Sequence, residues 1–132
     1  MSVSFGHVHV KSPNPHETAA WYIEMLDAEY VEEIDVDGAL FVRIRLGGVM
    51  CNVSSPAPGQ HLNDSSIDLR YGLEHFGLRV DDIEVVIAKM KQAGVPILQD
   101  IKKTTSGNRI AFVHGPDNVM IELSQYHAGF KS

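Results

Sequence analysis

The feature that most constrains the fold of this chain is an internal repeat. The segment SFGHVHV, starting at Ser4, alternates like a strand with two different faces, and apolar residues at helical spacing follow Asn14. Three extended stretches come next, separated by the turn signals Asp37-Gly38 and Gly47-Gly48. From His75 onward the same order of one strand, one helix and three strands recurs. The pattern predicts two tandem βαβββ modules.

The predicted modules cover residues about 3–55 and about 73–126 of a single domain, 1–132. The joining segment, residues 56–72, is rich in Pro, Gly, Asn, Asp and Ser, which is typical of a surface linker or a lid. We expect an α+β fold in which the strands of both modules form a cupped, barrel-like mixed sheet with the helices outside.

Each predicted helix carries an apolar stripe that should pack on a sheet. In the first helix Asn14 can cap the N-terminus, and the stripe consists of Ala19, Tyr22, Ile23 and Leu26. In the second helix Asp82 can cap, and the stripe consists of Ile83, Val86, Ile87 and Met90. Neither stripe carries chemistry of its own.

Composition excludes several kinds of partner. Eleven basic residues against seventeen acidic ones give a net charge of −6, so a nucleic-acid-binding surface is not expected. The start MSVSFGHVHV lacks the pattern of a signal peptide, and no apolar run is long enough to span a bilayer. The single cysteine, Cys51, lies in an apolar stretch that favours a buried, inert thiol. We therefore expect a cytoplasmic protein without a membrane partner.

The alternation within the first and fourth strand of each module places the unusual polar residues on one face. His7 and His9 oppose Val8 and Val10, and His75 and Arg79 oppose Phe76 and Leu78. Asn52 and Glu122 occupy matching places in the two fourth strands. Since the apolar faces must meet the helices, the polar faces are predicted to line a concave surface.

His7 and His75 form a possible metal site together with the Glu122 carboxylate. Neutral imidazole nitrogens with one carboxylate oxygen suit one divalent ion of Fe, Mn, Ni, Co or Zn, and leave open positions for substrate or water. Taken alone, each histidine is more simply explained as a half-buried residue that makes a local hydrogen bond. Glu122, however, stands among Val119, Ile121 and Leu123, where a carboxylate needs a cation or another partner.

These residues resemble the vicinal oxygen chelate superfamily, which includes glyoxalases, methylmalonyl-CoA epimerases, fosfomycin-resistance and bleomycin-resistance proteins. The resemblance covers nearly the whole chain and rests on the ordered set GHVHV, WYIEMLDAEY, LGGVMCNVSSP, LEHFGLRVDD and FVHGPDNVMIELSQ. The segment GNRIAFVHGPDN before MIELSQ is most similar to the epimerase and lactoylglutathione lyase branch.

The resemblance implies roles for individual residues. His7, His75 and Glu122 fall on the family's metal ligands, and Asn52 stands where glyoxalases often carry Glu and epimerases carry Gln. It also implies a small-molecule substrate, a homodimer, and proton transfer next to a carbonyl with Glu122 as base. On the same face, His9 is the candidate for a second acid or base or a substrate contact. Asn52 and Arg79 are further candidate substrate contacts.

Three other functions remain open at this point. A thiol transferase of the fosfomycin-resistance type uses the same three ligands. An Fe(II) extradiol dioxygenase uses two histidines and one carboxylate, and the uncharged Asn52 suits it. A non-catalytic antibiotic-binding protein of the bleomycin-resistance type needs no metal, and there the ligand residues are typically missing.

Overall fold

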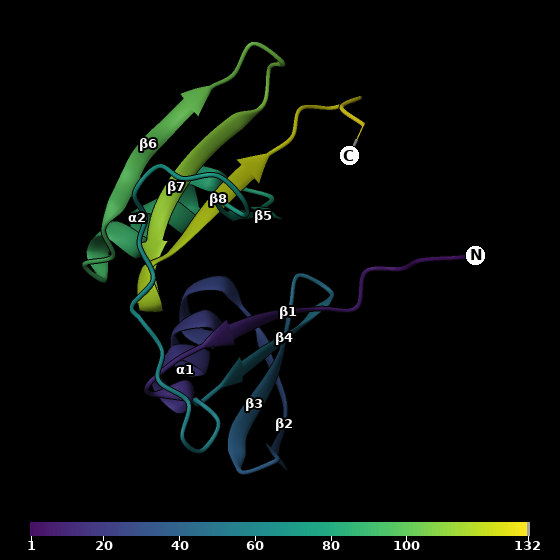
Figure 1. Cartoon of the computed structure of the whole chain (residues 1–132). Coiled ribbons are helices and arrows are strands. Elements are labelled where there is room, and N and C mark those ends of the chain that lie inside the picture. Colours follow the sequence, from purple (N-terminus) through teal and green to yellow (C-terminus); the bar gives the residue numbers. More distant parts are fainter. Residues whose placement is uncertain (132) are drawn as a thin grey trace. The chain divides into compact units, whose positions relative to one another are not determined.

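The computed structural model describes residues 1–131, in two compact units, one covering Met1–Asn63 and one starting at Asp64 (Figure 1). The first unit contains β1 (His7–Lys11), α1 (Pro15–Leu26), β2 (Glu29–Val36), β3 (Ala39–Leu46) and β4 (Val49–Ser54). The second contains β5 (Phe76–Arg79), α2 (Ile83–Gln92), β6 (Ile97–Lys103), β7 (Arg109–Gly115), the short 3₁₀ helix η1 (Pro116–Asn118) and β8 (Val119–Gln125). The predicted α+β fold with two βαβββ modules is confirmed. No helix within residues 1–131 is both long and apolar enough to cross a membrane.

The two four-stranded sheets share one topology. Their strand orders are β1-β4-β3-β2 and β5-β8-β7-β6, with the first and fourth strand of each unit parallel and the other pairs antiparallel. The registers also correspond, because His9 pairs with Asn52 and Gly77 pairs with Glu122. Asn52 and Glu122 therefore occupy equivalent places in the two units.

Helix α1 packs on β3 and β4, but its buried stripe differs from the predicted one (Figure 1). Ala19 and Tyr22 are buried as predicted, whereas Ile23 is 36% exposed and Leu26 is half-buried. Thr18 and Met25 are buried instead, because they flank Tyr22 at helical spacing. The Thr18 hydroxyl lies 2.9 Å from Ser12 Oγ, a hydrogen bond that makes its burial tolerable.

Helix α2 follows the prediction more closely. The Asp82 carboxylate accepts hydrogen bonds from the backbone N–H groups of Glu84 and Val85, so it caps the helix as expected. Ile83, Ile87 and Met90 are buried, and α2 packs on β6, β7 and β8. In β8, Ile121 and Leu123 are fully buried, while Glu122 between them points to the opposite face of the sheet.

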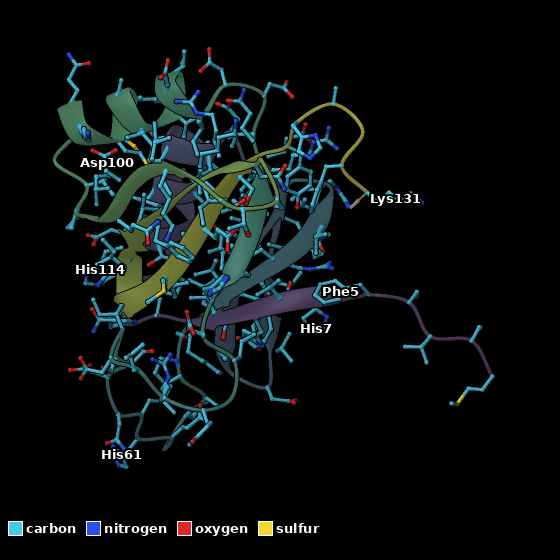
Figure 2. All side chains as sticks on the ribbon, turned by 90° about the horizontal axis from the view of Figure 1, so that it is seen from above. Phe5, His7, His61, Asp100, His114 and Lys131 are labelled. Carbon is cyan, nitrogen blue, oxygen red and sulfur yellow. The ribbon has the colours of Figure 1, made fainter. Side chains whose placement is uncertain are left out.

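The first strand of each unit starts later than predicted. Phe5 precedes β1 and is 76% exposed, on the extended segment visible in Figure 2. The parallel pairing begins at His7, opposite Met50, and the partner strand β4 itself starts only after the turn at Gly47 and Gly48. Residues before His7 therefore have no ladder partner in this sheet. In the second unit His75 directly precedes β5.

Cys51 is predicted to resist alkylation in the folded protein. The side chain is 1% exposed, and burial raises the pKa of the thiol to about 11. At pH 8 only about one thiol in a thousand is ionised, and the thiolate is the reactive form. Mass spectrometry after treatment with iodoacetamide should show unmodified protein in buffer and one added group in urea. Rapid labelling of the folded protein would contradict this burial.

Candidate metal centre

Two of the predicted ligands come together in the second unit. His75 Nε2 lies 3.0 Å from Glu122 Oε2, and the two side chains are 28% and 23% exposed. Strand β8 projects Glu122 away from the buried Ile121 and Leu123, while His75 approaches from the residue just before the neighbouring β5. The pair therefore stands on the sheet face that the alternation predicted.

Both members of the pair are held by further contacts. Ser124 Oγ donates a hydrogen bond of 2.7 Å to Glu122 Oε1. On the other side, His75 Nδ1 lies 3.3 Å from Glu74 Oε1, and the edge of the imidazole meets the Phe112 ring with centroids 5.0 Å apart. A histidine that donates Nδ1–H to a carboxylate keeps its lone pair on Nε2, the arrangement typical of metal-bound histidines.

The chemistry of this donor set fits a divalent cation. In that tautomer, both His75 Nε2 and Glu122 Oε2 present lone pairs, and they stand only 3.0 Å apart. Two such atoms repel each other unless a proton or a cation lies between or beside them. Metal bonds of about 2.1 Å bring neighbouring ligands to roughly 3 Å from each other, which matches this separation. The pair can thus serve as two ligands of one metal ion.

The third predicted ligand, His7, belongs to the first unit. It is the first residue of β1 and is exposed, as Figure 2 shows at the start of that strand. Its ring lies at an angle to that of His9, with centroids 6.4 Å apart. Within either unit, residues 1–131 bring no three His, Cys, Asp or Glu side chains into one metal-binding group. The structure therefore assembles two of the three predicted ligands inside a single unit.

His9 is held on the same sheet face as Asn52, its partner in register. His9 Nε2 lies 2.7 Å from the hydroxyl of the buried Ser54, and its ring tilts against Phe41 with centroids 5.1 Å apart. Burial lowers the pKa of His9, and the nearby Lys11 and His7 lower it further. At neutral pH the ring is therefore mostly neutral and able to accept a proton.

Asn52 contacts Arg43, and Arg43 contacts Glu32; the sequence analysis singled out neither residue. Asn52 Oδ1 accepts a hydrogen bond of 3.1 Å from Arg43 Nε, and Arg43 NH1 lies 2.7 Å from Glu32 Oε1. Arg43 could have been found from the turn at Gly47-Gly48, because a two-residue hairpin places it opposite Asn52. Glu32 could have been found in the same way, because the two-residue turn at Asp37-Gly38 places it opposite Arg43, ahead of the irregularity in β2.

Arg79, a predicted substrate contact, lies near the end of the second unit's sheet. Its guanidinium carbon stands 5.1 Å from the centre of the Tyr126 ring, a cation–π arrangement. The register pairs Arg79 with Ser124, two residues from Glu122 along β8. Arg79 thus shares the face of the His75 and Glu122 pair.

Comparison with known proteins identifies the family. The model of the Glyoxalase/Bleomycin resistance protein/Dioxygenase superfamily matches residues 4–123 of this chain. The chain belongs to this superfamily. The resemblance drawn from the sequence motifs is therefore confirmed.

Individual relatives agree with this assignment. A mitochondrial methylmalonyl-CoA epimerase from Bos taurus is 28% identical over 130 residues, which cover 90% of this chain and 72% of the relative. Among solved structures, a glyoxylase/bleomycin resistance protein/dioxygenase domain from Frankia sp. EAN1pec has a TM-score of 0.82 at 19% identity. The match covers 98% of this chain and 96% of the Frankia chain. The fosfomycin resistance protein FosX from Listeria monocytogenes has a TM-score of 0.72 at 16% identity, covering 97% of both chains. At these low identities, the two solved structures support the fold of this chain and nothing more.

Proposed function

We propose that this chain is a metal-dependent enzyme that moves a proton next to a carbonyl group of a small, oxygen-rich substrate. In this proposal His7, His75 and Glu122 hold one divalent ion. The observation that carries it is the pairing of His75 Nε2 with Glu122 Oε2 at 3.0 Å, on the face predicted for the site. The 28% identity to a methylmalonyl-CoA epimerase favours proton transfer over the other reactions of the superfamily.

The proposed reaction begins with removal of a proton from the carbon beside the carbonyl. Glu122 is the proposed base, because its Oε1 accepts a hydrogen bond from Ser124 and its Oε2 lies beside His75 in the proposed metal site. The electron pair left on carbon moves onto the carbonyl oxygen as an enolate. A bound divalent ion would lower the energy of that negative charge.

A second group must return a proton to the carbon, and His9 is the proposed candidate in its imidazolium form, after the neutral ring has taken up a proton from solvent. Its ring nitrogen already exchanges a hydrogen bond with Ser54, so the imidazole is held in one orientation. Return of the proton to the opposite side of the carbon inverts its configuration, and return to a neighbouring atom isomerises the substrate. Asn52 and Arg79 are proposed to contact substrate oxygens, and the active form is proposed to be a homodimer.

The test uses methylmalonyl-CoA as the probe, in D₂O, with the protein loaded with Co²⁺ and analysed by mass spectrometry. The wild type should incorporate one deuterium at the carbon beside the thioester, and Glu122→Gln should slow incorporation by at least about 100-fold, the lower range for loss of a general base. His16→Ala is the matched control, because His16 also pairs with a carboxylate, Glu33, at 2.7 Å, but on the exposed surface.

Two parallel measurements separate the proposal from its competitors. Oxygen consumption with catechol would indicate a dioxygenase, and thiol consumption with fosfomycin would indicate a transferase. Either activity in the absence of deuterium uptake would overturn the proposed reaction.

A further inference from the structure

Arg43 holds the Asn52 side chain in one orientation. The guanidinium Nε donates to Asn52 Oδ1 at 3.1 Å, while NH1 is anchored to Glu32 at 2.7 Å. Arg43 stands directly opposite Asn52 in the pairing of β3 with β4, and Glu32 stands opposite Arg43 in the pairing of β2 with β3. The three residues form a line across the sheet of the first unit. Asn52 is only 9% exposed within it.

The chemistry of this contact fixes which end of the amide is engaged. Arginine has only donors, so the atom that faces it must be the amide oxygen and not the nitrogen. The NH₂ group of Asn52 remains available to other partners, while Oδ1 keeps one further lone pair beside the guanidinium. An amide nitrogen has no lone pair for a metal ion, but it donates hydrogen bonds to anionic or carbonyl oxygens.

The repeat shows how the two units differ at this place. Glu122, the counterpart of Asn52, lies opposite Phe112 on β7, which leaves the negative charge of the carboxylate uncompensated from that side. Asn52 lies opposite Arg43, whose Nε–H group is directed at the amide oxygen and disfavours a cation there, although Glu32 balances the charge of the guanidinium. The corresponding positions of the two sheets therefore have different neighbours, an apolar ring beside Glu122 and an Arg–Glu pair beside Asn52.

We propose that Arg43, braced by Glu32, is a positioning residue that turns Asn52 into a hydrogen-bond donor for a substrate oxygen and keeps it from being a metal ligand. The substrate class this favours bears an anionic oxygen, such as a carboxylate or an enolate, within reach of the NH₂ group. The inference rests on the proposed metal-dependent function for its substrate, but the orientation of the amide does not depend on a metal.

The first experiment separates metal binding from substrate binding. Calorimetric titration with Co²⁺ should give Asn52→Ala an affinity within about threefold of the wild type, because no ligand is lost. Oxalate, used as an oxygen-chelating probe of the Co²⁺-loaded protein, should bind about tenfold more weakly to Asn52→Asp, which keeps the acceptor for Arg43 but lacks the NH₂ donor. A Co²⁺ affinity lowered more than about tenfold in Asn52→Ala, or unchanged oxalate binding by Asn52→Asp, would overturn the inference.

The second experiment needs no metal. Hydrogen exchange of the Arg43 Nε–H, followed by ¹⁵N NMR at low pH and temperature, should be slow in the wild type and in Asn52→Asp, and fast in Asn52→Ala. Equal exchange in all three proteins would show that Asn52 does not accept from Arg43. If the wild type binds no Co²⁺, the proposed function fails, and this measurement still decides the orientation of the amide.

Discussion

Replacing His75 with alanine should lower the affinity for Co²⁺ or Zn²⁺ by at least about 100-fold, the upper range for loss of a residue that merely supports a metal ligand. The reason is geometric, because His75 Nε2 is the only imidazole nitrogen that the second unit, as described up to residue 131, holds at 3.0 Å from Glu122 Oε2. Its removal would leave the carboxylate as the single proposed ligand in that unit. Equilibrium dialysis followed by elemental analysis measures the change.

Two further variants test whether the loss of metal affinity is specific to His75. Ser124→Ala removes the hydrogen bond of 2.7 Å to Glu122 Oε1 but no ligand, so its effect should be smaller, about tenfold. His16→Ala removes the exposed pair with Glu33 and should leave metal affinity unchanged. A loss in His16→Ala equal to that in His75→Ala would mean that metal binds nonspecifically to surface histidines.

Truncation of Leu123 to alanine should destabilise the fold by about 3 kcal/mol, within the usual range for a buried leucine. Leu123 is fully buried and lies in β8, which packs on α2, between Glu122 and Ser124, so the strand that carries Glu122 is also a core strand. The free energy of unfolding from urea titration, monitored by circular dichroism, measures the effect.

Leu98→Ala is the matched control for this variant. Leu98 lies on β6 and is 38% exposed, so the same truncation should cost well under half as much. Equal losses at the two positions would contradict the assignment of Leu123 to the core. Metal affinity of the folded Leu123→Ala protein then reports how far the position of Glu122 depends on core packing.

The repeat and the strand alternation made much of the site predictable. Alternation along VMIELSQ placed Glu122 opposite to its apolar neighbours, and the repeat related His75 to His7. The structure confirms that Ile121 and Leu123 face the core while Glu122 does not. These features depend on local periodicity, which a single sequence contains.

Other features depend on contacts between strands and could not be predicted in the same way. The strand alternation placed Asn52 on a polar face but did not show that it is buried, which follows from its contact with Arg43 on the neighbouring strand. The irregularity in β2 between Tyr30 and Glu32 depends on strand pairing and has no local signature. The start of β1 depends on where its partner β4 begins, so Phe5 was wrongly included in the strand.

The central claim is that His7, His75 and Glu122 hold one divalent metal ion, and elemental analysis of the wild-type protein tests it most directly. The protein should be purified without chelator or histidine tag, and its metal content compared with its concentration from amino-acid analysis. The account predicts one equivalent of a transition metal per chain, either as purified or after dialysis against Co²⁺ and removal of unbound ion. A wild-type protein that retains no metal under both conditions would contradict it.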